Sequence, residues 1–121
     1  MPRTADVLAL LTKTGVVVGS VAAGKRDPKD VDVVVSEATR PEDRRNPVFA
    51  RLATQWPDGE SLGPGHWWVD ADPLPVEVHC YTWHAVDPRK NAGMVSHRQA
   101  RRGAAIREVC GVSMYVQRVG E

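Results

Sequence analysis

Two valine-rich stretches near the start of the chain limit what it can fold into. Residues 16–18 carry no polar side chain, which is typical of an interior strand that is buried on both faces. Residues 30–35 read Asp-Val-Asp-Val-Val-Val. Because successive side chains of a strand point to opposite faces, Asp30 and Asp32 share one face, and the valines at the odd positions share the other. The chain is therefore expected to build its core around a β-sheet that carries two acids on one face.

The paired aspartates are the unusual part of this pattern, because aspartate is disfavoured in strands. Their Cα atoms would lie roughly 6.5 Å apart, since a strand rises about 3.3 Å per residue. Two like charges at this spacing resist ionisation unless a cation neutralises them. Hard carboxylate oxygens suit Mg²⁺ or Mn²⁺ better than zinc. The alternative is an edge strand whose acidic face is simply solvated.

A third acid lies in a later strand. Residues 75–81 alternate apolar and polar side chains, which places Glu77 on the face opposite Val76 and Val78. If this strand and the aspartate strand turn their valines into the same core, Glu77 points to the side of Asp30 and Asp32. Three carboxylates on one sheet face would form a two-cation site.

The order of these features resembles the DNA polymerase beta-like nucleotidyltransferase superfamily, in a minimal stand-alone form of the family X palm. An apolar strand ends in Gly19-Ser20, nine residues (21–29) follow, and the Asp-x-Asp strand precedes a strand with one flanked acid. The resemblance implies an α+β fold, with a small mixed sheet flanked by two to four helices. It also implies that Gly19 and Ser20 bind the triphosphate of an NTP, and that Asp30, Asp32 and Glu77 are the catalytic acids that hold two Mg²⁺ or Mn²⁺ ions.

The sequence departs from the family pattern at two positions. The third acid of the family is more often aspartate, so Glu77 adds a methylene group. Ala23 stands where the polymerase branch tends to have an arginine that contacts the phosphates. Lys25 or Arg26 would supply that charge from the next turn, and we predict Lys25 and Lys29 as nucleotide-binding residues. Residues 20–23 are expected to form the first turn of a short helix, whose free amides and dipole would favour an anion. A tight turn with Ser20 as a plain cap is the alternative.

The resemblance predicts transfer of a nucleoside monophosphate from an NTP to an acceptor hydroxyl. A basic strip over residues 89–107 favours a nucleic acid 3′ end as the acceptor, and Arg98, Arg101 and Arg102 are its predicted phosphate contacts. A solvated helix face is the alternative for these arginines. Two other functions stay open: modification of a partner protein, as in toxin-antitoxin pairs, and a non-catalytic module that binds nucleotide.

Composition limits the remaining function classes. With 121 residues, 42% of them hydrophobic, the chain is expected to form one domain over residues 1–121. The net charge of +1, from 16 basic and 15 acidic residues, indicates no partner by itself. No stretch approaches the roughly 18 apolar residues of a membrane span, and no signal-peptide core is present. We therefore expect a cytoplasmic monomer or homodimer without membrane contact.

Cysteines and histidines give weaker signals. Cys80 and Cys110 lack a C-x-x-C spacing and are expected to be buried thiols. The four histidines show no zinc-binding spacing, so a zinc site is not expected. Of the four tryptophans, those at positions 67, 68 and 83 are expected to be buried, although one of them stacking on a base is the alternative.

The remaining elements follow from periodicity and breakers. A helix is expected over residues 5–13, with Thr4 as N-cap and Gly15 as C-cap, and a second helix over 46–56. Residues 24–29, 36–45 and 57–65 are expected to be loops. Residues 66–69 and 74–82 form a predicted hairpin, whose turn contains Asp70 and Asp72. A last helix ends at Gly103 and leads into strands up to about residue 116.

Overall fold

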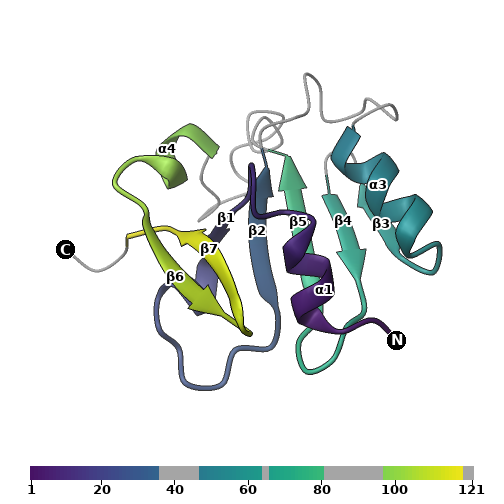
Figure 1. Ribbon diagram of the computed structural model, residues 1–121, viewed down its shortest axis with the longest axis horizontal. Coiled ribbons are helices and arrows are strands. Elements are labelled where there is room, and N and C mark those ends of the chain that lie inside the picture. The colour runs from purple at the N-terminus through teal and green to yellow at the C-terminus, as the bar shows by residue number, and fades with distance from the viewer. Residues whose placement is uncertain (36–46, 64–65, 81–96, 119–121) are drawn as a thin grey trace.

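The computed structural model describes residues 1–35, 47–63, 66–80 and 97–118, and these form one mixed sheet with helices on both faces (Figure 1). The sheet has seven strands in the order β3-β4-β5-β2-β1-β7-β6. In chain order the elements are α1 (Thr4–Ala9), β1 (Val16–Val18), α2 (Gly19–Ala22), β2 (Val31–Val35), α3 (Pro47–Gln55), β3 (Glu60–Gly63), β4 (His66–Val69), β5 (Val76–Cys80), α4 (His97–Arg101), β6 (Ala105–Val109) and β7 (Val112–Val116). The described residues thus form a small α+β protein with four short helices, which confirms the predicted fold class at this level.

The centre of the sheet is built from the valine-rich strands. β1 pairs antiparallel with β2 on one side and parallel with β7 on the other, and β2 pairs parallel with β5. All three residues of β1 are buried, as predicted for an interior strand. The register sets Val18 opposite Asp32, and Asp32 opposite Glu77. Three strands therefore bring the end of β1 and the starts of β2 and β5 to the same part of the sheet.

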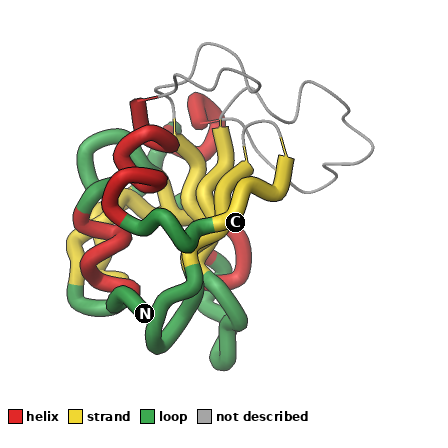
Figure 2. Tube along the Cα trace, turned by 90° about the vertical axis from the view of Figure 1, so that its right-hand side faces the viewer, coloured by secondary structure: helices red, strands yellow, loops and turns green. Residues whose placement is uncertain are grey.

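Both faces of the sheet are covered, which explains why its central strands are nearly all valine. One face, with Val17, Val33 and Val78, packs against α1 and α3 in the main core. The turned view shows these helices gathered on one side of the strands (Figure 2). The other face, with Val16 and Val34, packs against α4 in a smaller cluster. Because even-numbered residues of β2 point to this second face, Asp32 lies on the same side as α4.

The first helix differs from its prediction at both ends. α1 ends at Ala9 instead of residue 13, and its N-cap is Arg3, which makes no side-chain capping bond. Thr4 is fully buried instead. Its hydroxyl donates to the carbonyl oxygen of Leu74 at 2.5 Å and accepts from the Leu74 amide at 2.9 Å. The predicted cap is therefore wrong, because the Thr4 hydroxyl bonds to backbone groups of Leu74, just before β5, and not to the backbone of its own helix.

Gly15 is not the C-cap of α1, a position that Leu10 takes. A Cβ atom at Gly15 would come within 2.5 Å of the Leu11 carbonyl oxygen and 2.7 Å of a Val33 methyl group. Glycine is needed here because the chain passes directly between a helix turn and a core strand.

The middle of the chain contains one strand that was predicted as loop. β3 pairs antiparallel with β4 at the edge of the sheet, so the prediction of a loop over residues 57–65 is wrong for residues 60–63. The predicted helix over 46–56 corresponds to α3, and the predicted hairpin corresponds to β4 and β5. Asp70 and Asp72 lie exposed in the connection between these strands, as expected of turn residues.

The C-terminal part confirms the predicted helix and strands. Gly103, with a φ of 70°, follows α4 as a stop signal, and β6 and β7 form a hairpin. Cys110 and Gly111 form its turn, with φ of 49° and 84°. Cys110 is exposed, so the prediction of a buried thiol is wrong for this residue. Its place in the turn explains this, since a two-residue turn projects beyond the sheet.

Several predictions fall on residues that the structure does not describe. These are the loop over residues 36–45, the side chain of Cys80, Trp83, and the first part of the basic strip. Residues 24–29 form a loop, as predicted. Among the described residues, no helix combines the length and the apolarity needed to cross a membrane.

Candidate functional site

The three predicted acids lie together. Asp30 immediately precedes β2, Asp32 is the second residue of that strand, and Glu77 is its partner on β5. All three are half-buried, and each offers a carboxylate oxygen such that these atoms lie within 4.8 Å of one another. The parallel register of β2 and β5 produces this cluster, because paired residues of neighbouring strands point to the same face. The convergence that the alternating pattern predicted is therefore present, and the role of these residues as metal ligands stays a prediction.

Burial, together with neighbouring negative charge, controls the protonation of Glu77 and Asp30. Burial raises the pKa of Glu77 to about 8, and hydrogen bonding to Asp32 and the charges of Asp32 and Asp30 add to this effect. Burial also raises the pKa of Asp30, and the charge of Asp32 adds to it. At neutral pH Glu77 consequently keeps its proton. A carboxyl group that keeps its proton because it is buried beside an anion is one that a cation would ionise.

Asp32 behaves in the opposite way. Burial by itself would raise its pKa, but hydrogen bonds from His79 and Glu77 outweigh burial, and the net pKa of Asp32 is lowered. Asp32 is therefore the anion of the cluster, and it lies at the centre, with Asp30 on one side and Glu77 on the other.

Gly19 brings the backbone of the Gly-Ser turn against this anion. Its φ is +69°, and a Cβ atom at this position would lie 2.6 Å from Asp32 Oδ2. Only glycine can combine this backbone conformation with this close approach. Ser20 is half-buried beside it. The predicted phosphate-binding pair thus adjoins the acids.

The short helix after the turn contributes less than expected. α2 has only four residues, so few peptide dipoles add up at its N-terminus. Any preference of this turn for an anion must come from backbone approach at Gly19 and not from a helix dipole.

The predicted basic residues are not part of the cluster. Lys25 and Lys29 are exposed in the loop after α2, and within the described residues no ion pair joins them to the acids. Arg98 and Arg102 are exposed on or just after α4. The Arg101 guanidinium lies over the ring of Tyr115, 3.9 Å from its centroid. Within the part of the chain that the structure describes, Arg101 is thus the one of these five with a defined side-chain contact, and that contact is with a side chain of the sheet.

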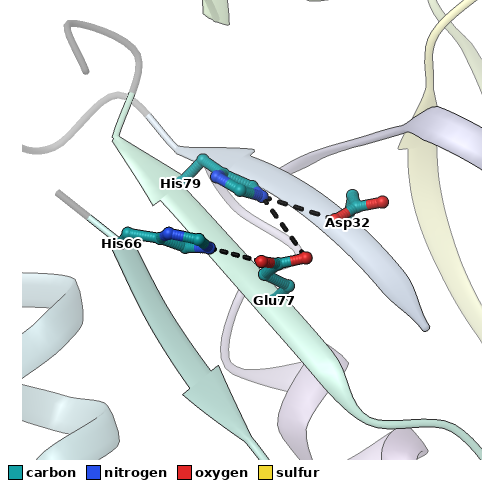
Figure 3. Close-up of polar contacts among 4 residues, drawn as sticks. All are labelled: Asp32, His66, Glu77 and His79. Carbon is teal, nitrogen blue, oxygen red and sulfur yellow. Dashed lines mark hydrogen bonds and ion pairs between the residues drawn. The ribbon is translucent and has the colours of Figure 1, made fainter. Parts of the chain in front are cut away.

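Two histidines that the sequence argument set aside belong to the site (Figure 3). His79 is 4% exposed, and its Nε2 lies 3.3 Å from Asp32 Oδ1 and 3.9 Å from Glu77 Oε2. Because Asp32 is ionised and can only accept, His79 donates its Nε2 proton to Asp32. His79 thus lies beside the space between two of the three acids.

His66 contacts the same glutamate from β4. Its Nε2 is hydrogen-bonded to Glu77 Oε1, and its ring stacks on that of His79 with centroids 4.4 Å apart. Burial and the charge of His79 lower the pKa of His66 to about 4. At neutral pH both His66 and Glu77 are therefore uncharged, so their contact is a hydrogen bond between neutral groups and not an ion pair.

The sequence carried a signal for one of these histidines. His79 follows Glu77 by two residues in an alternating strand, so it had to share the face of Glu77. His66 could not be placed in this way, because its position opposite His79 depends on the register of the β4–β5 hairpin. Spacing rules for zinc sites within one segment do not detect ligands on paired strands.

Comparisons with protein-family models, with curated proteins and with solved structures found no match to this chain. Evidence for a function therefore comes from the geometry of the site and from the motif.

The donor set fits hard divalent cations. Three carboxylates in mutual reach provide the oxygen ligands that Mg²⁺ and Mn²⁺ prefer. Burial and neighbouring negative charge raise the pKa of Glu77 and Asp30, and a cation would offset the part that comes from charge. Asp30, Asp32 and Glu77 could thus hold a metal, beside the backbone of Gly19.

Proposed function

We propose that this protein is a metal-dependent nucleotidyltransferase with the nucleotidyltransferase fold. It would transfer a nucleoside monophosphate from an NTP to an acceptor hydroxyl. The observation that carries this proposal is the convergence of Asp30, Asp32 and Glu77 beside the backbone of Gly19. This is the juxtaposition of acids and Gly-Ser turn that the sequence motif implies.

Each residue has a role in this proposal. Asp30, Asp32 and Glu77 would provide the oxygen ligands, with Asp32 as the ionised acid. Two divalent cations, when bound, stabilise the charge of the attacking and leaving oxygens in an in-line displacement. Gly19 and Ser20 would hold the triphosphate close to the acids, because the missing Cβ atom of Gly19 lets the backbone of the turn approach Asp32.

The reaction needs no covalent enzyme intermediate. The oxygen of the acceptor hydroxyl forms a bond with the α-phosphorus as the bond from that phosphorus to the bridging oxygen breaks. Pyrophosphate leaves, and the hydroxyl proton passes to solvent or to a carboxylate of the cluster. The lack of a nucleophile motif in the sequence is consistent with this chemistry.

A nucleic acid 3′ end is the acceptor we favour. Helix α4 packs on the sheet face that carries Asp32, and its Arg98 is exposed, as is Arg102 just beyond it. Exposed arginines next to a catalytic face suit a phosphate backbone. A hydroxyl of a partner protein, as in toxin-antitoxin pairs, is the other acceptor to test.

The experiment is incubation with labelled NTPs and Mg²⁺ or Mn²⁺, together with oligonucleotides or cell lysate, followed by detection of labelled products and of pyrophosphate. The double variant Asp30→Ala/Asp32→Ala should lose metal-dependent pyrophosphate release. Asp70→Ala/Asp72→Ala is the matched control, because these acids have the same spacing but lie exposed in a turn. Unchanged turnover in the first variant, or equal loss in both, would reject the assignment.

One observation favours a second candidate function, a non-catalytic nucleotide-binding module. His79 already donates a hydrogen bond to Asp32, the ionised acid, so this carboxylate has a partner without a cation. Titration calorimetry with NTP and Mg²⁺ separates the two candidates. Binding without pyrophosphate release supports the module, and release supports the transferase.

A further inference from the structure

The two histidines and Glu77 form a second set of potential ligands on the same sheet face. His66 on β4 and His79 on β5 are paired in register, and Glu77 lies two residues before His79. One nitrogen or oxygen atom from each of the three lies within 4.8 Å of the others. Unlike the acids, this set combines two imidazoles with one carboxylate.

The orientation of the side chains is suited to a shared ligand. The two rings stack with an interplanar angle of 26°, and the Nε2 atom of each points to Glu77 (Figure 3). His66 Nε2 is next to Oε1, and His79 Nε2 is 3.9 Å from Oε2. A zinc ion with ligands at about 2.0–2.2 Å keeps those ligands roughly 3.4 Å apart when tetrahedral. The three ligand atoms of His66, Glu77 and His79 lie within 4.8 Å of one another, so small side-chain rotations would bring them to the spacing that the ion requires.

We propose that His66, Glu77 and His79 bind a first-row transition metal such as Zn²⁺, at a position next to the oxygen cluster. Imidazole nitrogen favours Zn²⁺ and its neighbours, whereas Mg²⁺ requires oxygen ligands. To bind the ion through Nε2, each histidine would carry its single ring proton on Nδ1, and Glu77 would release its carboxyl proton to solvent. The side chains of His66 and Glu77 are 14% and 18% exposed, which gives an ion access from solvent.

Glu77 is then common to both sets, with Asp30 and Asp32 on one side and the histidines on the other. The proposal does not require the transferase activity, because it concerns the affinity and the type of the ion. If the transferase activity fails its test, the nitrogen site can still be measured directly.

The test is the affinity for Zn²⁺ and Mg²⁺, measured by titration on the whole chain and its variants. His66→Gln should lower the Zn²⁺ affinity at least tenfold and leave the Mg²⁺ affinity within about twofold. Asp30→Asn should lower the Mg²⁺ affinity and spare that for Zn²⁺. Equal Zn²⁺ affinity in His66→Gln and the unmodified protein would overturn the proposal, and so would parallel loss in both variants.

A second measurement needs no substitution. In long-range ¹H–¹⁵N NMR spectra, Zn²⁺ should shift the ring-nitrogen resonances of His66 and His79. His97 is the internal control, because its Nε2 donates to the Thr14 carbonyl oxygen at 2.7 Å, outside the site. Unmoved resonances of His66 and His79 at saturating Zn²⁺ would contradict the proposed ligands.

Discussion

Replacing Glu77 with glutamine should make the metal-free protein more stable at high pH. Glu77 has a pKa of about 8 in the folded chain against an ordinary value of 4.5. Between these values the folded state binds more protons than the unfolded state, so the free energy of unfolding falls as pH rises through this window. Glutamine cannot ionise and can donate to Asp32 as the protonated acid does. The free energy of unfolding of Glu77→Gln should therefore not fall as pH rises through this window.

The magnitude follows from the difference in proton affinity. A tenfold change in proton affinity corresponds to about 1.4 kcal/mol. The full difference between pKa values of about 8 and 4.5 would therefore change the free energy of unfolding by about 5 kcal/mol. The Glu77 side chain is 18% exposed, and solvent screens part of the repulsion. Between pH 5 and pH 9 we expect the unmodified protein to lose about 2–3 kcal/mol of unfolding free energy relative to Glu77→Gln.

The assay is urea denaturation in a chelating buffer across that pH range. The gain in stability of Glu77→Gln over the unmodified protein should grow with pH. Glu108→Gln, a change at an exposed glutamate of β6, should follow the unmodified protein throughout. Adding Mg²⁺ should stabilise the unmodified protein at high pH and have little effect on Glu77→Gln. Parallel stability profiles for Glu77→Gln and the unmodified protein would contradict the raised pKa of Glu77 in the folded chain.

Three further predictions concern the backbone and the core. Thr4→Val removes two buried hydrogen bonds and should lower the free energy of unfolding by about 1–3 kcal/mol in urea denaturation, whereas Thr4→Ser should retain most of it. Gly19→Ala should cost more stability than Gly24→Ala, by 1 kcal/mol or more in the same assay, and should weaken stabilisation by Mg²⁺. Both glycines have positive φ, of +69° and +75°, but only Gly19 would clash with Asp32. Cys110→Asn should raise the melting temperature by an amount equivalent to about 0.5 kcal/mol, because asparagine suits the positive φ of 49° in this turn; an unchanged or lower value would contradict that account.

Much of the site could be predicted because alternation in a strand is a local property. The shared face of Asp30 and Asp32, and the direction of Glu77, follow from residues two apart in one segment. That the two strands are neighbours was an additional assumption, supported by the valines on their opposite faces. The parallel pairing of β2 with β5 agrees with it.

What was missed depends on contacts between segments. His66 belongs to the site because β4 pairs it with His79 on β5. Thr4 does not cap its helix because its hydroxyl is hydrogen-bonded to Leu74, 70 residues away in the sequence. β3 has four residues without clear alternation, so its partner strand defines it more than its own sequence does. These features depend on tertiary pairing, which local patterns do not encode.

The close approach of Gly19 to Asp32 has a consequence for ligand binding. Because Asp32 Oδ2 occupies the space that a Cβ atom of Gly19 would fill, a triphosphate that shifts the turn would also shift a proposed ligand of the cation. Binding free energies are reciprocal, so whatever effect nucleotide has on cation affinity, the cation must have on nucleotide affinity. Titrations of either one should therefore depend on the concentration of the other, and a variant that separates turn from carboxylate should make the two curves independent.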